Sequence, residues 1–159
     1  MTLEAKTEAF LAQKRIAVAG VSRSAGTGNG IYDRMKARGY AVFAINPNAT
    51  EINGEPCYPN LKAIPGGVDA VMIATRPEIT EKVVGECVEL GIPHVWMHYN
   101  ALFGESNSSV SETAVAMCRE NGINVIPGGC PMMYGTTADF GHKCMRWILG
   151  VTGKLPQEA

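Results

Sequence analysis

The sequence has no long run of apolar residues, and its longest apolar runs are far too short to cross a lipid bilayer. It also has no excess of one charge, because 14 Lys and Arg residues nearly balance 15 Asp and Glu residues. A chain so close to neutrality has no overall field that would attract nucleic acid or an anionic membrane. Glu4 and Glu8 interrupt the apolar pattern of the first segment, which excludes a signal-peptide core. We therefore expect a cytoplasmic protein with neither a nucleic-acid nor a membrane partner.

Paired metal ligands and paired thiols are missing as well. The five cysteines are scattered and no two form a C-x-x-C pair, which excludes zinc-ribbon and thioredoxin-like sites. Scattered thiols without a secretion signal are typical of a reducing compartment. His94 and His98 are four residues apart, but they lie at the start and end of an expected strand, and His142 lies in the last expected helix, so no pair has the i, i+4 spacing of ligands on one helix. No carboxylate is placed to orient any of the three. The sequence thus predicts no metal site and no catalytic residue.

What the sequence does contain is a regular alternation of short apolar runs with amphipathic segments. Glycine, proline and asparagine punctuate the alternation, and Asn53-Gly54 predicts a tight turn within a turn-rich stretch from 48 to 65. This rhythm predicts right-handed βαβ crossovers. We expect an α/β, three-layer Rossmann-like fold with a five-stranded parallel sheet in the order 3-2-1-4-5, forming a single domain over 1–159 with its core at about 13–150. The expected strands are 15–20, 40–45, 69–74, 94–97 and 123–126, and the expected helices are 7–13, 31–38, 77–90, 110–120 and 138–149.

In an open α/β sheet, ligands bind beyond the carboxyl ends of the strands. The segment after the first strand, Gly20 to Gly26, contains Arg23 between Ser22 and Ser24. A helix follows it, so free backbone N–H groups, two hydroxyls and a guanidinium are available for a phosphate. We favour a phosphate-binding loop over the alternative, a plain glycine-rich turn.

The loop is not the fingerprint of a dinucleotide site. Gly26, Gly28 and Gly30 alternate, but the third glycine at the required spacing is missing. NAD sites also have an acidic residue at the end of the second strand, where this chain has Asn46-Pro47. Both departures argue against NAD.

Arg76 directly follows the third expected strand, between Thr75 and Pro77. It is either a surface residue that caps the next helix or a second cation for phosphate, since an Arg at a helix N-terminus is unfavourable unless an anion binds there. The sequence leaves both interpretations open.

Five segments together resemble the stand-alone CoA-binding domain family, which is similar to the N-terminal CoA-binding domain of the succinyl-CoA synthetase alpha subunit. The segments are Arg15-Ile-Ala-Val-Ala-Gly-Val-Ser-Arg, Val42-Phe-Ala-Ile-Asn-Pro, Val68-Asp-Ala-Val-Met-Ile-Ala-Thr-Arg-Pro, His94-Val-Trp-Met-His and Gly129-Cys-Pro. The resemblance covers about Gln13 to Pro131. It implies a Rossmann-like fold with a CoA site along the strand ends.

Carried over by position, the resemblance implies that Ser22 to Ala25 wrap the CoA phosphates and that Asn46 and Pro47 flank the adenosine. It places Met97 to Tyr99 nearer the pantetheine arm. The complete expected cofactor-binding set is Gly20, Val21, Ser22, Arg23, Ser24, Ala25, Asn46, Pro47, Thr75, Arg76, Pro77, Met97, His98 and Tyr99.

The chain departs from the family pattern mainly near the pantetheine end. His98 and Asn100 replace the usual glutamine and glycine, the loop at 101–109 is longer, and Gly128-Gly129 replaces an Asp-Arg pair. The synthetase's second domain, with its phosphorylated histidine, has no counterpart in this sequence.

These observations favour a non-catalytic protein that binds CoA or acyl-CoA. An NAD(P)-linked oxidoreductase and a protein-interaction module with a vestigial pocket remain as alternatives. We interpret Cys130 as a small apolar filler, with a mixed disulfide to CoA as the alternative. The last helix contains the apolar residues Phe140, Met145, Trp147, Ile148 and Leu149. We expect much of this set in the core, with a residual exposed apolar stripe that suits a homodimer.

Overall fold

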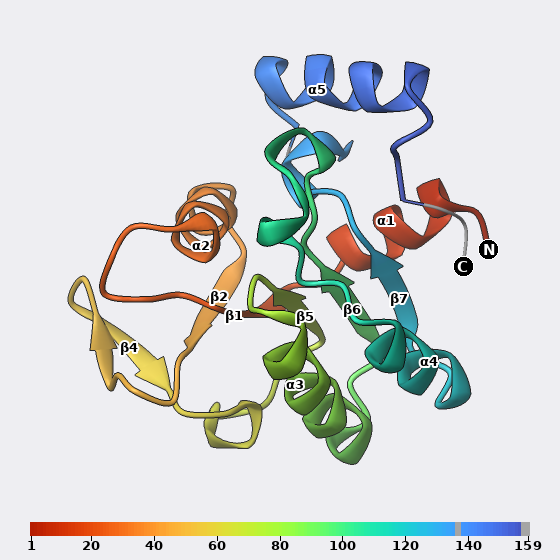
Figure 1. Cartoon of the computed structure of the whole chain (residues 1–159). Helices are drawn as coiled ribbons and strands as arrows, with labels where there is room; N and C mark the ends of the chain where they lie inside the picture. The colour runs from red at the N-terminus through yellow and green to blue at the C-terminus, as the bar shows by residue number, and fades with distance from the viewer. Residues whose placement is uncertain (136–137, 157–159) are drawn as a thin grey trace.

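A computed structural model describes residues 1–135 and 138–156 of the chain (Figure 1). The α-helices are α1 (Leu3–Leu11), α2 (Thr27–Ala37), α3 (Pro77–Leu90), α4 (Glu112–Glu120) and α5 (Phe140–Val151). The strands are β1 (Arg15–Ala19), β2 (Ala41–Ile45), β3 (Glu51–Ile52), β4 (Glu55–Tyr58), β5 (Ala70–Ile73), β6 (His94–Met97) and β7 (Asn124–Pro127). Four short 3-10 turns complete the described elements: η1 (Leu61–Ala63), η2 (Ala101–Phe103), η3 (Glu105–Asn107) and η4 (Pro131–Met133).

The sheet has seven strands in the order β3-β4-β2-β1-β5-β6-β7, so the predicted number of five strands was wrong. All neighbouring strands are parallel except β3, which runs antiparallel to β4. The sheet is therefore mixed, and mostly parallel. The α/β, Rossmann-like class itself is confirmed.

The predicted strand order was also wrong, because β5 does not lie beside β2. Instead β4 pairs with β2, with Ile45 opposite Tyr58, and occupies that side of it. β5 pairs with the other side of β1, with Ile16 opposite Ala70. The added strands form a hairpin whose turn is Asn53-Gly54, with φ angles of 52° and 79°. A two-residue turn with both φ values positive matches the twist of a hairpin, and this turn was predicted correctly.

Alternate residues of the strands face two separate hydrophobic layers. On one side Ile16 and Val18 pack with Phe10, Met35 and Trp96, beneath α1 and α2. On the other side Ala17 and Ala19 pack in the layer beneath α3 and α4. Helices cover both faces of the sheet, which confirms the three layers (Figure 1).

Helix α3 has the predicted bounds, with Pro77 in its first turn and Gly91 in the left-handed conformation at its end. Helix α2 begins earlier than predicted, at Thr27, so three alternating glycines lie at or within its first turn. Over the described part of the chain, no helix combines the length and apolarity needed to span a bilayer.

Candidate functional site

A cleft of about 550 Å³ opens at the carboxyl ends of β1, β2 and β5, against the first half of α3. This is the end of the sheet where ligands bind in open α/β folds. Its lining is Ala19, Gly20, Val21, Ser22, Ile45, Asn46, Pro47, Asn48, Pro59, Thr75, Arg76, Ile79, Lys82, Val83 and Glu86. Seven of the expected site residues are thus brought together around one cavity.

Glycine is required where the chain turns from β1 into this cleft. Gly20 has a φ of +102°, and a Cβ atom there would lie 2.3 Å from the carbonyl oxygen of Ala74. A Cβ on Gly28, in α2, would lie 2.4 Å from the carbonyl oxygen of Gly20. The missing side chains therefore let β1, β5 and α2 converge closely at the mouth of the cleft.

Asparagine side chains hold the loops after β1 and β2 in place. The Asn29 amide both accepts from Ser22 N (3.0 Å) and donates to Ser22 O (2.7 Å). Asn46 Nδ2 donates to Val21 O (2.9 Å), while its Oδ1 accepts from Asn48 N (2.8 Å). Both loops are thereby fixed by side-chain bonds to backbone, which organises the cleft before any ligand enters.

Two exposed cations line the cleft, both on or next to α3. Arg76 is the residue that precedes the first helical turn, and Lys82 follows along the helix. The carboxylate of Glu86, also in the lining, accepts from Leu61 N at 2.8 Å. Arg23 lies outside the lining, and its Nη2 donates to Asn48 O at 3.3 Å. Arg76 is thus both an exposed residue at the start of α3 and part of the cavity lining, so both interpretations remain compatible with its position.

A smaller hollow of about 260 Å³ adjoins the cleft and shares Gly20, Thr75 and Arg76 with it. Its other walls are the start of α2 and the loop after β6, with Gly26, Thr27, Gly28, Ala74, His98, Ser106, Asn107, Ser108 and Ser109. The N-cap residue of α2 is Gly26, which makes no side-chain cap hydrogen bond, and the first residues of the helix lie at this hollow with their N–H groups. Uncapped N–H groups and a positive helix end favour an anion there.

The expected residues of the β6 end are arranged differently from those of the cleft. Met97 is fully buried, and neither it nor Tyr99 lines the cleft or the adjoining hollow. Tyr99 N donates to Gly129 O at 3.2 Å, which links the chains leaving β6 and β7. His98 does line the hollow, but burial lowers its pKa to about 4, so the imidazole is neutral at pH 7.

Three more expected residues lie beside the cleft rather than in its lining. Ser24 and Ala25 are exposed in the loop after β1, where Ser24 O accepts from Ser22 Oγ at 2.6 Å. Pro77 begins α3.

Cys130 is buried, and burial raises the pKa of its thiol to about 11. A thiol with that pKa is protonated at pH 7 and is a poor nucleophile.

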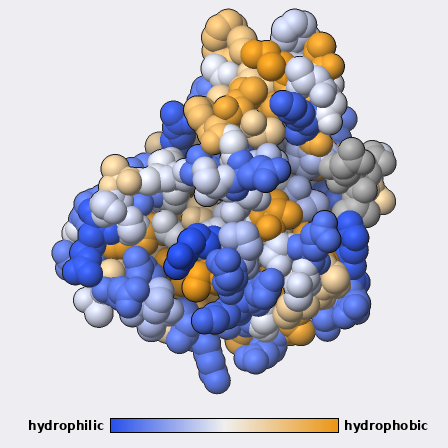
Figure 2. Space-filling view, in the orientation of Figure 1, coloured by the Kyte–Doolittle hydropathy of each residue, from blue (hydrophilic) through white to orange (hydrophobic). Residues whose placement is uncertain are grey.

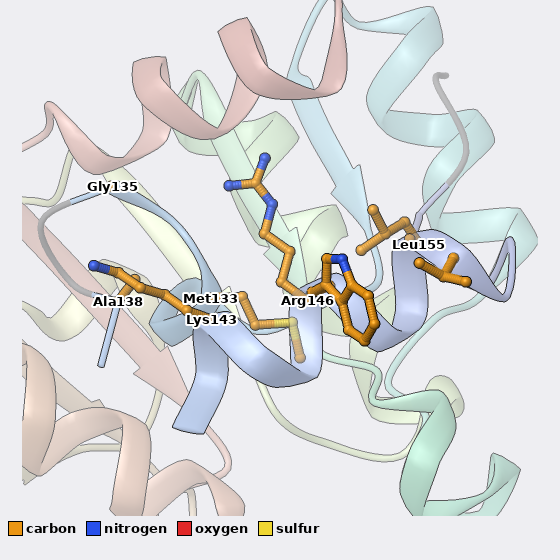
Figure 3. A pocket seen from close by; sticks show the side chains of 9 residues that line it. Met133, Gly135, Ala138, Lys143, Arg146 and Leu155 are labelled. Carbon is orange, nitrogen blue, oxygen red and sulfur yellow. The ribbon is translucent and has the colours of Figure 1, made fainter. Parts of the chain in front are cut away.

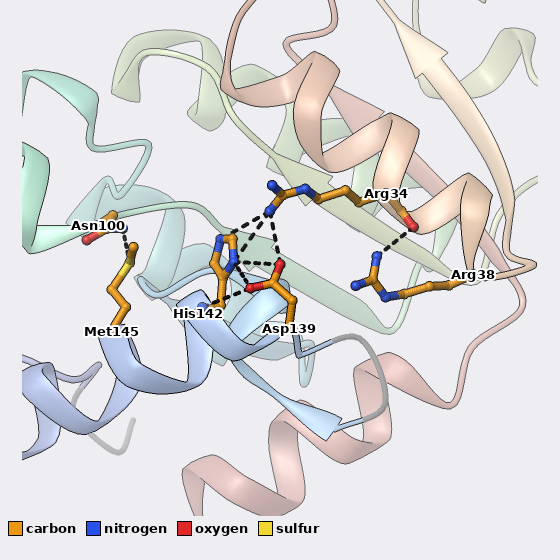
Figure 4. A network of polar contacts seen from close by, with 6 residues as sticks. All are labelled: Arg34, Arg38, Asn100, Asp139, His142 and Met145. Atoms are coloured by element: carbon orange, nitrogen blue, oxygen red, sulfur yellow. Dashed lines mark hydrogen bonds and ion pairs between the residues drawn. The ribbon is translucent and has the colours of Figure 1, made fainter.

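The expectation that no carboxylate orients a histidine was wrong for His142. The Asp139 carboxylate lies 2.8 Å from His142 Nδ1 and also accepts from the His142 backbone N–H at 2.9 Å (Figure 4). Arg34 Nη1 lies 3.4 Å from the same carboxylate. These bonds lower the pKa of Asp139, the backbone N–H of His142 being the largest cause. The pair is missed when only i, i+4 spacing is sought, whereas an Asp-x-x-His at a helix start would have indicated it.

Sequence reasoning also missed the contributions of helices α2 and α3. Asn29 holds Ser22, and Ile79, Lys82, Val83 and Glu86 form one wall of the cleft. Their positions repeat every three or four residues, which is the spacing of one helix face. That pattern was visible, but only the strand order reveals which face meets the ligand. Within 1–135 and 138–156, no three His, Cys, Asp or Glu residues are grouped as metal ligands.

Comparisons with known proteins agree with this architecture. Residues 14–136 match the family model described as a CoA binding domain. Uncharacterized protein YneT of Bacillus subtilis is 32% identical over 118 residues, which cover 74% of this chain and 82% of that protein. Acetate–CoA ligase [ADP-forming] II of Archaeoglobus fulgidus is 30% identical over 117 residues, which cover 70% of this chain but only 17% of the ligase. The chain thus spans less than a fifth of the length of that ligase.

Solved structures show the same fold. A hypothetical protein from Pyrococcus horikoshii aligns with a TM-score of 0.72 and 26% identity, over 83% of this chain and 88% of that one. Acetyl-coenzyme A synthetase 1 of Ca. Korarchaeum cryptofilum aligns with a TM-score of 0.58 and 25% identity, over 71% of this chain and 25% of the synthetase. Since the family model covers most of the chain, this protein belongs to the CoA-binding domain family.

Proposed function

We propose that this protein binds CoA or acyl-CoA without catalysing a reaction on it, with the nucleotide in the cleft between β2 and α3. The observation that carries the proposal is the preorganised cleft, where Asn46 and Asn29 fix the loops and two cations line the wall. Membership of the CoA-binding domain family supports the choice of ligand. The phosphates would lie by the loop after β1, near Arg76 and the uncapped start of α2.

The adjoining hollow is where the pantetheine arm would continue. It shares Gly20, Thr75 and Arg76 with the cleft, so one extended ligand could reach both cavities. This placement gives different roles to Met97, His98 and Tyr99. His98 would contact the ligand, while Met97 and Tyr99 would support the wall from within.

An NAD(P)-linked oxidoreductase is the weaker candidate. Such sites use a carboxylate at the end of the second strand to accept from ribose hydroxyls. Here Asn46 stands at that position, and its amide already donates to Val21 O and accepts from Asn48 N. A vestigial pocket is also disfavoured, because the cleft is open and about 550 Å³ in volume.

The protonation states of His98 and Cys130 support the absence of catalysis. A general base needs a pKa near the working pH, whereas that of His98 is lowered to about 4. A nucleophilic thiol needs a lowered pKa, whereas that of Cys130 is raised to about 11. Asp139 and His142 have a structural role as the cap of α5. A single domain over 1–159, a cytoplasmic location and a homodimer complete the proposal.

Titration calorimetry and thermal unfolding, each with CoA and with NAD, test the choice of ligand. We expect CoA to bind and to raise the melting temperature by mass action, with NAD giving a much smaller shift. Arg76→Ala should weaken CoA by ~1.5–3 kcal/mol if the guanidinium bonds to a phosphate. Lys14→Ala, an exposed cation at the opposite end of β1, is the matched control and should bind CoA normally. A larger shift with NAD, or equal losses in both variants, would overturn the proposal.

Incubation with acetyl-CoA and succinyl-CoA tests the absence of chemistry. Hydrolysis would consume water and release a carboxylate and the free CoA thiol, which a thiol reagent detects. We expect no steady release. Turnover that disappears in His98→Ala or Cys130→Ala would make the protein an enzyme.

A further inference from the structure

Helix α5 is apolar on two opposite faces. Leu149 is 1% exposed and packs in the core, and Met145 on the same side packs against it. Met145 Sδ also accepts from Asn100 Nδ2 at 2.8 Å (Figure 4). These contacts, with the ion pair between Arg34 of α2 and Asp139 at the start of α5, attach one face of α5 to the body of the protein.

The opposite face carries a stripe of exposed residues, which we call the outer stripe. It consists of Phe140, Cys144, Trp147, Ile148 and Val151. The spacing i, i+4, i+7, i+8 and i+11 places all five on one side of a helix. Phe140 is 83% exposed, Trp147 71%, Val151 71% and Ile148 42%. Figure 1 shows α5 raised above the sheet, and Figure 2 shows apolar side chains gathered over that part of the surface.

The exposed apolar area is large for an isolated molecule. Aromatic side chains bury about 150–250 Å² each when covered, so Phe140 and Trp147 alone offer on the order of 300 Å². A standard protein interface takes about 800 Å² from each partner. Two side chains therefore supply over a third of what an interface needs, and the rest of the outer stripe adds to it.

A groove of about 490 Å³ lies along one edge of the outer stripe. Trp147, Gly150 and Val151 form its α5 side, and Met133 and Leu155 add apolar surface (Figure 3). Lys143 and Arg146 line it too, but the Arg146 guanidinium lies 4.6 Å from the centre of the Tyr134 ring of the same chain. The groove is continuous with the stripe, because Trp147 and Val151 belong to both.

We propose that the outer stripe is covered by the same stripe of a second copy of this chain, in a two-fold dimer with the two α5 helices antiparallel. A two-fold axis midway along the stripe pairs Phe140 with the partner's Val151 and Cys144 with the partner's Trp147. Each pair combines a large side chain with a small one, so the stripe is complementary to itself in size, as an isologous interface requires.

The groove and the charges agree with this arrangement. The partner's Phe140, opposite Val151, meets the end of the groove that Val151 and Leu155 line. Lys143 lies at the edge of the stripe, opposite the partner's Ile148, where its long stem lets the ammonium reach water. The inference does not rest on ligand binding, since the stripe and the cleft are formed by different residues.

Sedimentation of the wild-type chain and of Trp147→Asp tests the dimer. We expect a wild-type dimer, and a variant whose dimerisation is weakened at least about 100-fold, because a central Trp is a typical interface hot spot and the dimer loses two. Leu90→Asp, which changes an exposed apolar residue of α3, is the matched control and should remain dimeric. Circular dichroism and CoA titration of all three proteins show whether each one is folded.

Cross-linking at Cys144 reports on the geometry independently. Cys144 is the exposed cysteine, whereas the other four are buried. A short bis-maleimide should therefore yield a covalent dimer that is lost in Cys144→Ser. A wild-type monomer at every concentration, or a dimer that survives Trp147→Asp and is not linked through Cys144, would overturn the proposal. A monomer that instead binds an apolar dye, lost in Trp147→Asp, would assign the stripe to another occupant and equally overturn it.

Discussion

The polar groups that follow β1, β2 and β5 face an open cleft, whereas His98 after β6 and Cys130 after β7 are buried. Ser22, Asn46 and Arg76 line the cleft and are partly or fully exposed. His98 and Cys130, at the other half of the same edge, are 6% and 5% exposed. The sheet topology places reactive residue types at both halves, and burial decides how far each one is exposed to solvent.

Burial also sets the charge on each half. The cleft has the cations Arg76 and Lys82, which suit phosphate. The buried half is neutral at pH 7, because burial lowers the pKa of His98 to about 4 and raises that of Cys130 to about 11. One half is therefore suited to binding an anion, and the other to packing against an uncharged part of the ligand.

The largest effect is expected where the open half depends on close backbone contact. Gly28→Ala would place a Cβ atom 2.4 Å from Gly20 O and 3.1 Å from Val21 N, so α2 must move away from the loop. We expect a loss of about 3 kcal/mol in the free energy of unfolding, the upper range for overpacking, together with weaker CoA binding. Urea unfolding and calorimetry measure the two effects.

Gly30→Ala is the matched control for this prediction. It lies in the same helix, but a Cβ atom there would meet nothing within 4 Å. We expect it to stabilise the protein by about 0.5–1 kcal/mol, because alanine is the better helix former. Similar effects of both substitutions on the free energy of unfolding would show that helix propensity, and not the contact with Gly20, determines the effect at residue 28.

A second prediction concerns the buried half and pH. His98 titrates near pH 4 in the folded protein and near pH 6.5 in the unfolded chain, so the unfolded state binds more protons between these values. Stability from this group is therefore complete above about pH 6.5 and is lost as the pH falls towards 4. We expect a contribution of about 2 kcal/mol to be lost between pH 7 and pH 5.

His98→Gln should remove that part of the pH dependence. Urea unfolding at pH 7 and pH 5 gives the change in the free energy of unfolding between the two pH values. This change should be smaller in the variant than in the wild type. Burial also lowers the pKa of His94, but His94 is present in both proteins and its effect cancels. An unchanged pH dependence in the variant would mean that folding does not lower the pKa of His98, and the contrast between the two halves would fail.

The sequence predicted the elements better than their arrangement. Helix α3 was predicted at its observed bounds, because proline and glycine mark both ends. Strands β3 and β4 were not counted in the predicted sheet, although Cys57-Tyr58 indicates a short extended piece, since β3 has two residues and β4 contains Pro56. Missing β4 led directly to the wrong order, because nothing else occupied the outer side of β2. Strand order depends on such long-range pairing, which local patterns do not encode.

The candidate site shows the same contrast between local features, which the sequence predicted, and long-range arrangement, which it did not. Loop residues such as Gly20, Asn46 and Arg76, which line the cleft, were selected because they directly follow strands, where the fold class places ligands. Lys82 and Asn29 were missed because their roles depend on how α3 and α2 pack beside those loops. Met97 was expected at the ligand but is fully buried, since a strand end alone does not tell which face a side chain takes.

The smallest effect on ligand binding is expected at the rim of the cleft. Arg23 is exposed, lies outside the cavity lining, and donates to Asn48 O at 3.3 Å. If its guanidinium bonds to a CoA phosphate, Arg23→Ala should weaken binding by ~1.5 kcal/mol, the lower end for a bond to a charged group, at low salt. The loss should shrink as salt rises, because exposed charges are screened within about 10 Å at 0.1 M ionic strength. Arg76, which lines both cavities, should keep more of its effect at the same salt. Calorimetry of both variants across a salt series therefore shows which of the two guanidinium groups is more strongly screened by salt. An Arg23→Ala variant that binds CoA normally at low salt would limit the site to the cleft lining, with Arg23 serving only to hold the turn at Asn48.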